Sequence, residues 1–235
     1  MGADFDSRFI NDYIELDEVD STNRFALDTG REGLLVTARS QFSGKGTKGR
    51  TWFSPCGTNL YLTMTFGKPD PRFPLVAGVA LRETVSFFLP DSDVCIKWPN
   101  DIIVSGQKVC GILCESRGTI TAVGAGMNVN QLAWPDDLKD RAISFAQVSK
   151  KQYELIQVVK QAVFHIDHWF TLFFEKGFAP VRQRFLEYGL LNGHKILTDE
   201  GIECCIVDLN MEGHLLINVS GRLKTLSSGS IHIAR

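Results

Sequence analysis

Residues 41–63 read QFSGKGTKGRTWFSPCGTNLYLT, and residues 97–115 read KWPNDIIVSGQKVCGILCE. The first stretch is a glycine-rich, basic loop that leads directly into an apolar strand. Its glycines let backbone N–H groups face an anion, and Lys45, Lys48 and Arg50 add positive charge. The second stretch leads from a proline turn into further strands. Together they predict a pocket that collects cations around a carboxylate and a phosphate.

The loop matches one phosphate-binding pattern without its required context. Residues 44–49 fit G-x-G-x-x-G, but a dinucleotide site needs a helix to begin there. Strand-forming residues and Pro55 follow instead, and no G-K-[ST] closes a Walker loop. Taken alone, the loop is either an anion-binding loop or a solvated charged turn.

Composition limits the classes of partner. The chain has 235 residues, 44% apolar and 22% charged, with a net charge of −2. Its length suits one large domain with a small one, and its charge gives no field that attracts nucleic acid or an anionic membrane. Residues 1–12 lack the apolar core of a signal peptide, and no apolar run approaches the roughly 20 residues of a membrane span. We expect a cytoplasmic protein with no nucleic-acid or membrane partner.

Six cysteines are scattered along the chain, and none forms a Cys-x-x-Cys pair. Zinc and redox sites therefore have little support. In a reducing cytosol such residues act as small buried hydrophobes. We predict no metal site built from protein ligands.

The order of apolar periods predicts an α+β fold, a mixed sheet with helices on one face. Strands are expected at residues 13–16, 34–39, 60–66, 94–98, 102–105, 109–115 and 119–128. Helices are expected at 22–29, 74–89, 150–176 and 180–188. After Gly189 the pattern changes to short strands at 195–198, 203–208, 214–219, 222–226 and 230–233, typical of a small SH3-like barrel. We predict domains at 1–189 and 190–235.

Two further clusters favour the anion-binding interpretation of the loop. In the first, Asn100 and Asp101 follow a proline at the end of a strand, where binding groups gather, and Asp101 could hold a metal ion or a lysine. Lys108 precedes an apolar strand, so it is either a cation held near an apolar wall or a snorkelling surface lysine. The second cluster, GAGMN at 124–128, lets backbone approach a ligand, or is a small-residue strand packed on a helix.

Five segments in this order resemble the biotin protein ligases, also called biotin–[acetyl-CoA carboxylase] ligases. They are DSTN (20–23), GKGTKGRTWFSPCGTNLYLTM (44–64), KWPND (97–101), KVCGILCE (108–115) and GAGMNVN (124–130). The chain is most similar to the short form, which lacks an N-terminal DNA-binding domain. The resemblance implies a class II synthetase-like catalytic fold followed by an SH3-like barrel.

The resemblance also implies a reaction in two halves. ATP, with Mg²⁺, activates biotin to biotinyl-5′-AMP, and a lysine of a biotin carboxyl carrier protein then takes the biotin. Two anions must meet in the first half, which suits a cationic pocket. The adenylate is labile in water, which suits a loop that closes over it.

Roles of individual residues follow only from the matched motifs. The resemblance places biotin against Ser21, Thr22, Asn23, Gln41, Gly44, Lys45, Gly46, Thr47, Lys108 and Gly111. It places ATP or the adenylate against Lys48, Arg50, Trp52, Asn100, Lys108 and Asn128. It assigns catalytic roles to Lys108, Arg50 and Asp101.

One position departs from the family pattern. The usual loop is G-R-G-R-x-G-R, and this chain has G-K-G-T-K-G-R, with Thr47 where an arginine is common. Lys48 could substitute, but as a point charge without a bidentate fork. We hypothesise looser retention of biotinyl-AMP.

Two other functions remain as alternatives: a lipoate or octanoate transferase of the same general fold, and a catalytically inert biotin-binding module. The KWPND and GRTWFSP segments favour biotin, and the presence of Lys108, Arg50 and Asp101 favours an active enzyme. The barrel is expected to order the nucleotide end of the site or to dock the carrier protein. Family members dimerise through edge strands, so a homodimer is an open expectation.

Overall fold

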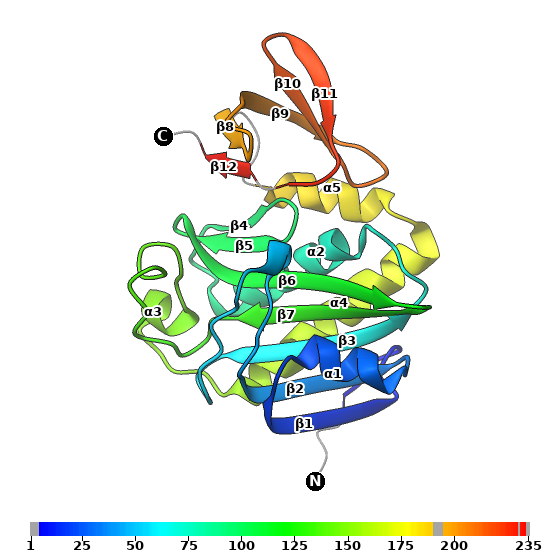
Figure 1. Cartoon of the computed structure of the whole chain (residues 1–235), viewed down its shortest axis with the longest axis vertical. Coiled ribbons are helices and arrows are strands. Elements are labelled where there is room, and N and C mark those ends of the chain that lie inside the picture. Colours follow the sequence, from blue (N-terminus) through cyan, green and yellow to red (C-terminus); the bar gives the residue numbers. More distant parts are fainter. Residues whose placement is uncertain (1–4, 190–194, 230, 234–235) are drawn as a thin grey trace.

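The computed structural model describes residues 5–189, 195–229 and 231–233, and it contains two β-sheets (Figure 1). The larger sheet has seven strands in the order β1-β2-β3-β7-β6-β5-β4. These strands are β1 (Asp12–Val19), β2 (Leu34–Gln41), β3 (Leu60–Gly67), β4 (Val94–Lys97), β5 (Asp101–Val104), β6 (Gln107–Arg117) and β7 (Ile120–Met127). β1 and β2 are parallel and every other neighbouring pair is antiparallel, so the predicted mixed sheet is confirmed.

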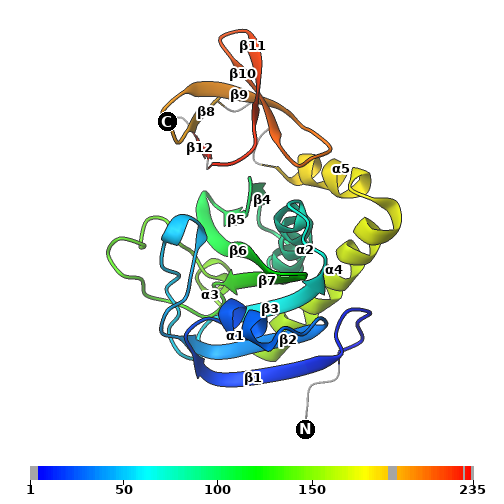
Figure 2. The same cartoon turned by 45° about the vertical axis from the view of Figure 1, so that its right-hand side comes forward.

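Helices cover both faces of this sheet, so the expectation of helices on one face is wrong. Helix α1 (Thr22–Thr29) packs on β2, β3 and β7 from one side. Helices α2 (Phe73–Phe88), α4 (Leu155–Lys176) and α5 (Ala179–Tyr188) lie together on the other side (Figures 1 and 2). The cause is the parallel β1–β2 pair, which needs a crossover along a sheet face, and α1 is that crossover.

Aromatic side chains attach α2 and α4 to the sheet. Phe66 of β3 stacks on Phe170 of α4 with ring centroids 4.1 Å apart, and Phe73 of α2 lies edge-on to Phe170 at 5.1 Å. All three are at most 2% exposed. Burial of each such side chain contributes roughly 1.5–3 kcal/mol, so this cluster fixes the layer behind the site.

The helix predicted at 150–176 begins later than expected. Helix α3 (Phe145–Ser149), which the periodicity did not reveal, precedes it and ends at Lys150 in the left-handed region, with φ 61°. Ser144 and Gln147 form a capping box that starts α3. A left-handed residue cannot continue a helix, so α4 begins only at Leu155.

The second sheet contains five antiparallel strands in the order β11-β10-β9-β8-β12. They are β8 (Lys195–Thr198), β9 (Glu203–Leu209), β10 (Leu215–Val219), β11 (Arg222–Leu226) and β12 (Ile231–Ile233). This arrangement confirms the prediction of a small SH3-like unit. The predicted boundary between 189 and 190 adjoins residues 190–194, which lie outside the described residues, so the exact division stays a prediction.

Polar contacts attach the second sheet to the first unit. The Trp98 indole Nε1 donates to the carbonyl of Gly213 at 3.2 Å, and Arg182 of α5 bonds both carboxylate oxygens of Asp208, at 2.5 and 2.6 Å. Trp98 belongs to the turn between β4 and β5, so the second sheet is docked beside the KWPND segment.

All six cysteines are free. Cys110 and Cys204 are buried as expected, and burial raises the pKa of the Cys110 thiol to about 12. Cys56 and Cys205 are exposed, so the prediction of buried cysteines is wrong for these two. Cys205 alternates with Cys204 along β9 and therefore points outward, and Cys56 lies in a turn. None of the described helices is both long enough and apolar enough to span a membrane.

Candidate functional site

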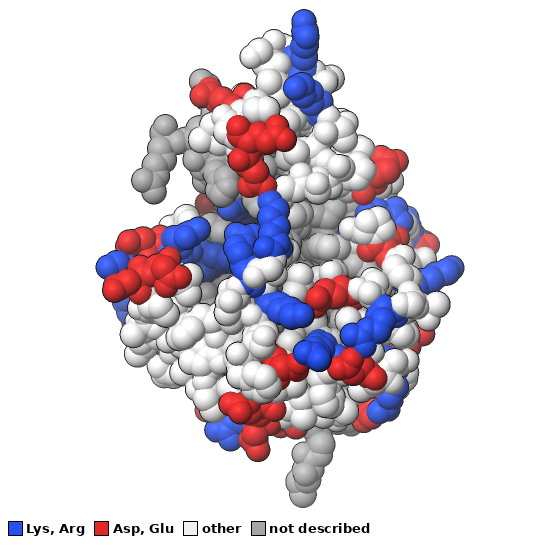
Figure 3. Space-filling model, viewed as in Figure 1, with Lys and Arg blue, Asp and Glu red and all other residues white. Residues whose placement is uncertain are grey.

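A pocket opens on the α1 face of the large sheet, beneath the loop that joins β2 to β3. Its walls come from the start of α1, the loop, and strands β6 and β7. The lining residues are Ser21, Thr22, Asn23, Gln41, Lys45, Gly46, Thr47, Trp52, Asn100, Lys108, Gly111, Ile112, Leu113, Gly124, Ala125 and Gly126. Figure 3 shows Lys and Arg side chains gathered on the same face of the molecule, over the region of the loop.

A network of hydrogen bonds fixes the α1 end of the pocket. Gln41 Oε1 accepts from the backbone N–H of Thr22 at 2.9 Å, and Thr63 Oγ1 lies 2.9 Å from Thr22 Oγ1 and 2.8 Å from Asn23 Oδ1. Asn23 Nδ2 donates to the carbonyl of Leu113 at 3.0 Å. Thr22, Asn23 and Thr63 are at most 4% exposed. This end therefore presents a fixed array of donors and acceptors.

Glycine is required where α1 meets β7. A Cβ on Gly124 would lie 2.1 Å from Asn23 Oδ1, closer than any real contact. Because Gly124 has no Cβ, Asn23 can hydrogen-bond Thr63 and the Leu113 carbonyl of β6 at the same time. Gly124 thus maintains the polar array, as the GAGMN segment predicts for a close approach of backbone.

Trp52 lies flat against the backbone of β6 and β7 at the centre of the pocket. A Cβ on Gly126 would come within 2.3 Å of the indole, and one on Gly111 within 2.7 Å. The indole is therefore an aromatic surface packed on the sheet, and its buried N–H group has no hydrogen-bond partner among the described residues.

Lys108 and Asp101 form an ion pair at the edge of this aromatic surface. Lys108 Nζ lies 2.6 Å from Asp101 Oδ1, and it also lies 5.0 Å from the centroid of the Trp52 ring. The register of β5 and β6 shifts between Ile102 and Ile103, which marks a bulge beside Lys108. Bulges re-aim side chains next to functional sites, and this one accompanies the turn of Lys108 toward Asp101.

Further cations surround the same carboxylate. Lys97 is the cross-strand partner of Asp101 in the β4–β5 pair. Burial lowers the pKa of Lys97, the Asp101 charge opposes this shift, and Lys108, Arg50 and Arg141 add to it. Several positive groups thus lie near a single aspartate, so the cluster keeps a net positive charge that can bind an incoming anion.

Asn100 and Asn128, both predicted for the site, hold neighbouring backbone segments in place. Asn100 Nδ2 donates to the carbonyl of Ile112 at 2.8 Å and thereby ties the KWPND turn to β6. Asn128 Nδ2 donates to the carbonyls of Lys108 and Ile143, each at 3.1 Å. Both hydrogens of Asn128 are therefore used to hold Lys108 and the segment before α3.

The loop itself is held mainly by its own backbone. Gly46 N–H donates to the Arg50 carbonyl at 2.7 Å, and Trp52 N–H donates to the Gly44 carbonyl at 2.9 Å. The short 3-10 turn η1 (Thr47–Gly49) forms its tip and contains no buried residue. Arg50 folds back onto Thr47, where Nη2 lies 3.0 Å from the threonine hydroxyl. Lys48 Nζ forms an ion pair with Asp199 of the second sheet.

Most of the residues predicted for the site meet in this pocket. Those that line it are Ser21, Thr22, Asn23, Gln41, Lys45, Gly46, Thr47, Trp52, Asn100, Lys108 and Gly111. Gly44, Lys48, Arg50, Asp101 and Asn128 lie near it but are not lining residues in this structure. Their assigned contacts with ligand stay predictions.

Sequence reasoning omitted several lining residues: Ile112, Leu113, Gly124, Ala125 and Gly126. β6 and β7 contain continuous buried runs without alternation, so the sequence alone does not reveal which of their residues face α1. Lys97 was also omitted from the site, although the KWPND segment contains it. Within the described residues, no group of three His, Cys, Asp or Glu side chains could hold a metal ion.

The model of the biotin/lipoate A/B protein ligase family matches residues 16–131 of this chain, the segment that contributes every wall of the pocket. Bifunctional ligase/repressor BirA of Bacillus spizizenii is 30% identical over 236 residues, which cover 91% of this chain and 70% of that protein. The biotin–[acetyl-CoA-carboxylase] ligase of Paracoccus denitrificans is 32% identical over 205 residues, which cover 79% of this chain and 84% of that protein.

Solved structures show the same fold. Biotin protein ligase from Aquifex aeolicus in complex with biotin and ATP has a TM-score of 0.86 at 28% identity, covering 96% of this chain and 100% of that chain. Biotin protein ligase from Leishmania major in complex with biotinyl-5-AMP has a TM-score of 0.66 at 25% identity, covering 96% of this chain and 99% of that chain.

Proposed function

This chain belongs to the biotin protein ligases, and on that premise we propose that it activates biotin with ATP and transfers it to a lysine of a biotin carboxyl carrier protein. The observation that carries the proposal is the position of Lys108. Lys108 lines the same pocket as the polar residues of α1 and residues of the basic, glycine-rich loop, and its ammonium pairs with Asp101. That is the point where a carboxylate and a phosphate have to meet.

In the first half-reaction, a carboxylate oxygen of biotin attacks the α-phosphorus of ATP. The bond to the β-phosphate oxygen breaks, and pyrophosphate leaves. Lys108 reduces the repulsion between the two anions, because its ammonium can bond both the carboxylate and an α-phosphate oxygen. Those oxygens would compete with Asp101, which holds Lys108 in place before they arrive.

The α1 array is the proposed site of the biotin ureido ring. That ring has two N–H donors and one carbonyl acceptor in a compact plane. Ser21, Thr22 and Asn23 offer hydroxyl and amide groups at the closed end of the pocket, and their positions are set before the ligand binds. A preformed site loses less entropy on binding.

Adenine and phosphate are assigned to the opposite end. The Trp52 indole provides an aromatic face for a base, and the cations near Asp101 provide charge for phosphates. Mg²⁺ would arrive on the ATP phosphates and neutralise them.

In the second half-reaction, the neutral ε-amine of the carrier lysine attacks the acyl carbon of biotinyl-AMP. An amide bond forms, the bond from the acyl carbon to the phosphate oxygen breaks, and AMP and a proton leave. The loop over the pocket would exclude water until the carrier arrives. A cytoplasmic location fits the free thiols of the chain.

Purified protein mixed with ATP, Mg²⁺ and biotin should release pyrophosphate in step with biotin consumed. Addition of a biotin carboxyl carrier domain should give a biotinylated product, and a Lys→Arg change at the acceptor lysine should abolish it. Lipoate in place of biotin tests the transferase alternative. Pyrophosphate release with lipoate alone would contradict the proposal, and binding of biotin without release would indicate an inert module.

A further inference from the structure

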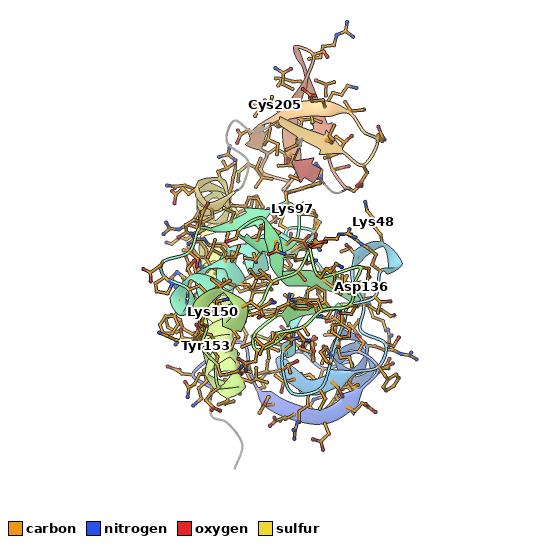
Figure 4. The ribbon with its side chains drawn as sticks, turned by 90° about the vertical axis from the view of Figure 1, so that its left-hand side faces the viewer. Lys48, Lys97, Asp136, Lys150, Tyr153 and Cys205 are labelled. Atoms are coloured by element: carbon orange, nitrogen blue, oxygen red, sulfur yellow. The ribbon has the colours of Figure 1, made fainter. Side chains whose placement is uncertain are left out.

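A charged pair joins the second sheet to the loop over the pocket. Lys48 Nζ at the loop tip pairs with Asp199, which lies in the turn between β8 and β9. Figure 4 shows Lys48 at the tip of the loop with its side chain directed toward the second sheet. Lys48 lies outside the set of pocket-lining residues, whereas Lys45, Gly46 and Thr47 belong to it. The loop therefore turns one side to the pocket and one cation to the other sheet.

Asp199 is presented from a well-defined position. In its turn, Gly201 N–H donates to the Thr198 carbonyl at 2.9 Å, and Thr198 N–H donates to the Ile202 carbonyl at 3.0 Å. The sheet that carries the turn is docked on the catalytic sheet through Trp98 and Gly213. A docked sheet with a closed turn can act as a fixed point for the loop.

The tip of the loop lies at the surface. Turn η1 contains no buried residue, and Lys48 adopts φ 59°, a conformation that non-glycine residues seldom take. Its backbone bonds, Gly46 to Arg50 and Trp52 to Gly44, close the base of the loop on itself without joining the tip to the sheet beneath. The Lys48–Asp199 pair therefore joins an exposed loop tip to the second sheet.

We infer that Asp199 is a positioning residue for the adenylate: by holding Lys48 it keeps the tip of the loop over the pocket and slows the escape of the bound intermediate. The expected effect on adenylate release rests on the proposed function, but the Lys48–Asp199 pair itself can be tested without any ligand. Lys48 is thereby assigned to loop closure, as an alternative to the direct adenylate contact implied by the family pattern.

The ligand-free test measures amide hydrogen exchange at residues 44–50. Asp199→Asn should exchange faster there than the unchanged protein, while Glu200→Gln should not. Glu200 is a matched control, since it lies in the same turn, is exposed, and makes no ion pair with any of the described residues. Equal exchange in all three proteins would overturn the inference whatever the protein catalyses.

The second test measures release of preformed biotinyl-AMP into an excess of unlabelled ligand. Asp199→Asn should shorten the lifetime of the complex about two- to fivefold, the size expected for an exposed ion pair. High salt should shorten the lifetime in the unchanged protein and have less effect in the variant. The double exchange Lys48→Asp with Asp199→Lys should restore part of the lifetime lost in each single variant.

A longer lifetime in Asp199→Asn would overturn the inference, since it would mean that the freed ammonium binds the adenylate directly. Failure of the exchanged pair to restore any lifetime would also count against it. Absence of pyrophosphate release in every protein would refute the proposed function alone, and the exchange measurement would then still decide the contact.

Discussion

At the α1 end of the pocket, Thr22, Asn23 and Thr63 are at most 4% exposed and joined by short hydrogen bonds, whereas at the loop end Lys48 and Arg50 are exposed. The buried network has no freedom to rearrange without loss of several bonds at once. The tip of the loop is closed by its own backbone bonds and carries the exposed Lys48–Asp199 ion pair. This difference indicates that the end assigned to biotin is preformed, and that the end assigned to the intermediate can open.

The largest expected effect is at Lys108, where the two ends meet. Lys108→Met should reduce biotin-dependent pyrophosphate release by about 10²–10³-fold, as expected for loss of a charge that stabilises the transition state. Biotin affinity should fall far less, because the α1 network remains. Equal loss of affinity and turnover would show that Lys108 only binds substrate. Steady-state rates and calorimetry on the same preparation separate the two.

A pair of glycine variants tests the contrast between the two ends. Gly124→Ala places a Cβ 2.1 Å from Asn23 Oδ1, so the network must shift. Biotin affinity should fall at least about tenfold, and the free energy of unfolding should fall by about 1–3 kcal/mol. Gly46→Ala places a Cβ 3.4 Å from the nearest atom, the Arg50 carbonyl oxygen, and should leave biotin affinity within about twofold. Calorimetric titration and thermal unfolding measure both. Similar losses from the two variants would refute the contrast.

Thr47→Arg tests the loop end alone. An arginine there adds a bidentate donor beside the pocket, so the lifetime of bound biotinyl-AMP should increase about fivefold. The Thr47 hydroxyl also contacts the Arg50 guanidinium, and Thr47→Val separates loss of that contact from gain of charge. An unchanged release rate in Thr47→Arg would remove the hypothesis of loose retention.

The smallest expected effect concerns the helices on the other face of the sheet. Burial alone would raise the pKa of Glu83, but hydrogen bonds from His165 and Trp169 and the charge of Arg184 lower it overall. Because the folded pKa lies below the unfolded value of 4.5, the stabilisation is present at neutral pH and is lost as the pH falls below 4.5.

Glu83→Gln should therefore lower the free energy of unfolding by about 1 kcal/mol at pH 7, and the difference should shrink in acid. Glu187→Gln is the control, since its ion pair with Arg184 joins two half-exposed side chains and should contribute little. Denaturant unfolding at pH 7 and below pH 4.5 measures both. A difference that grows in acid would contradict the assignment.

Much of the site was predictable because it lies in short segments with strong local signals. The glycine loop, the KWPND turn, the start of α1 and the KVCGILCE segment were each visible, and eleven of their predicted residues line one pocket. Gly124 and Gly126 were noticed as a close approach of backbone but were not assigned to the site. Their facing residues, Asn23 and Trp52, come from distant segments, and only the three-dimensional structure shows the contact.

The fold was predicted to the level of two units, and the errors have local causes. Helix α1 was found, but its place on the opposite face from α2 depends on the parallel β1–β2 pair, which the pattern did not specify. Lys150 fitted a helical period, yet it ends α3 in a left-handed conformation. The Lys48–Asp199 pair joins residues 151 positions apart, beyond the reach of any local pattern.

The most direct test is a structure of this protein with biotin and a non-hydrolysable ATP analogue, or with a stable analogue of biotinyl-AMP. The account predicts that Lys108 Nζ lies within about 2.7–3.2 Å of an oxygen from the carboxylate and of one from the α-phosphate, with the ureido ring against α1. A ligand seated in this pocket while Lys108 remains bound only to Asp101 would contradict it.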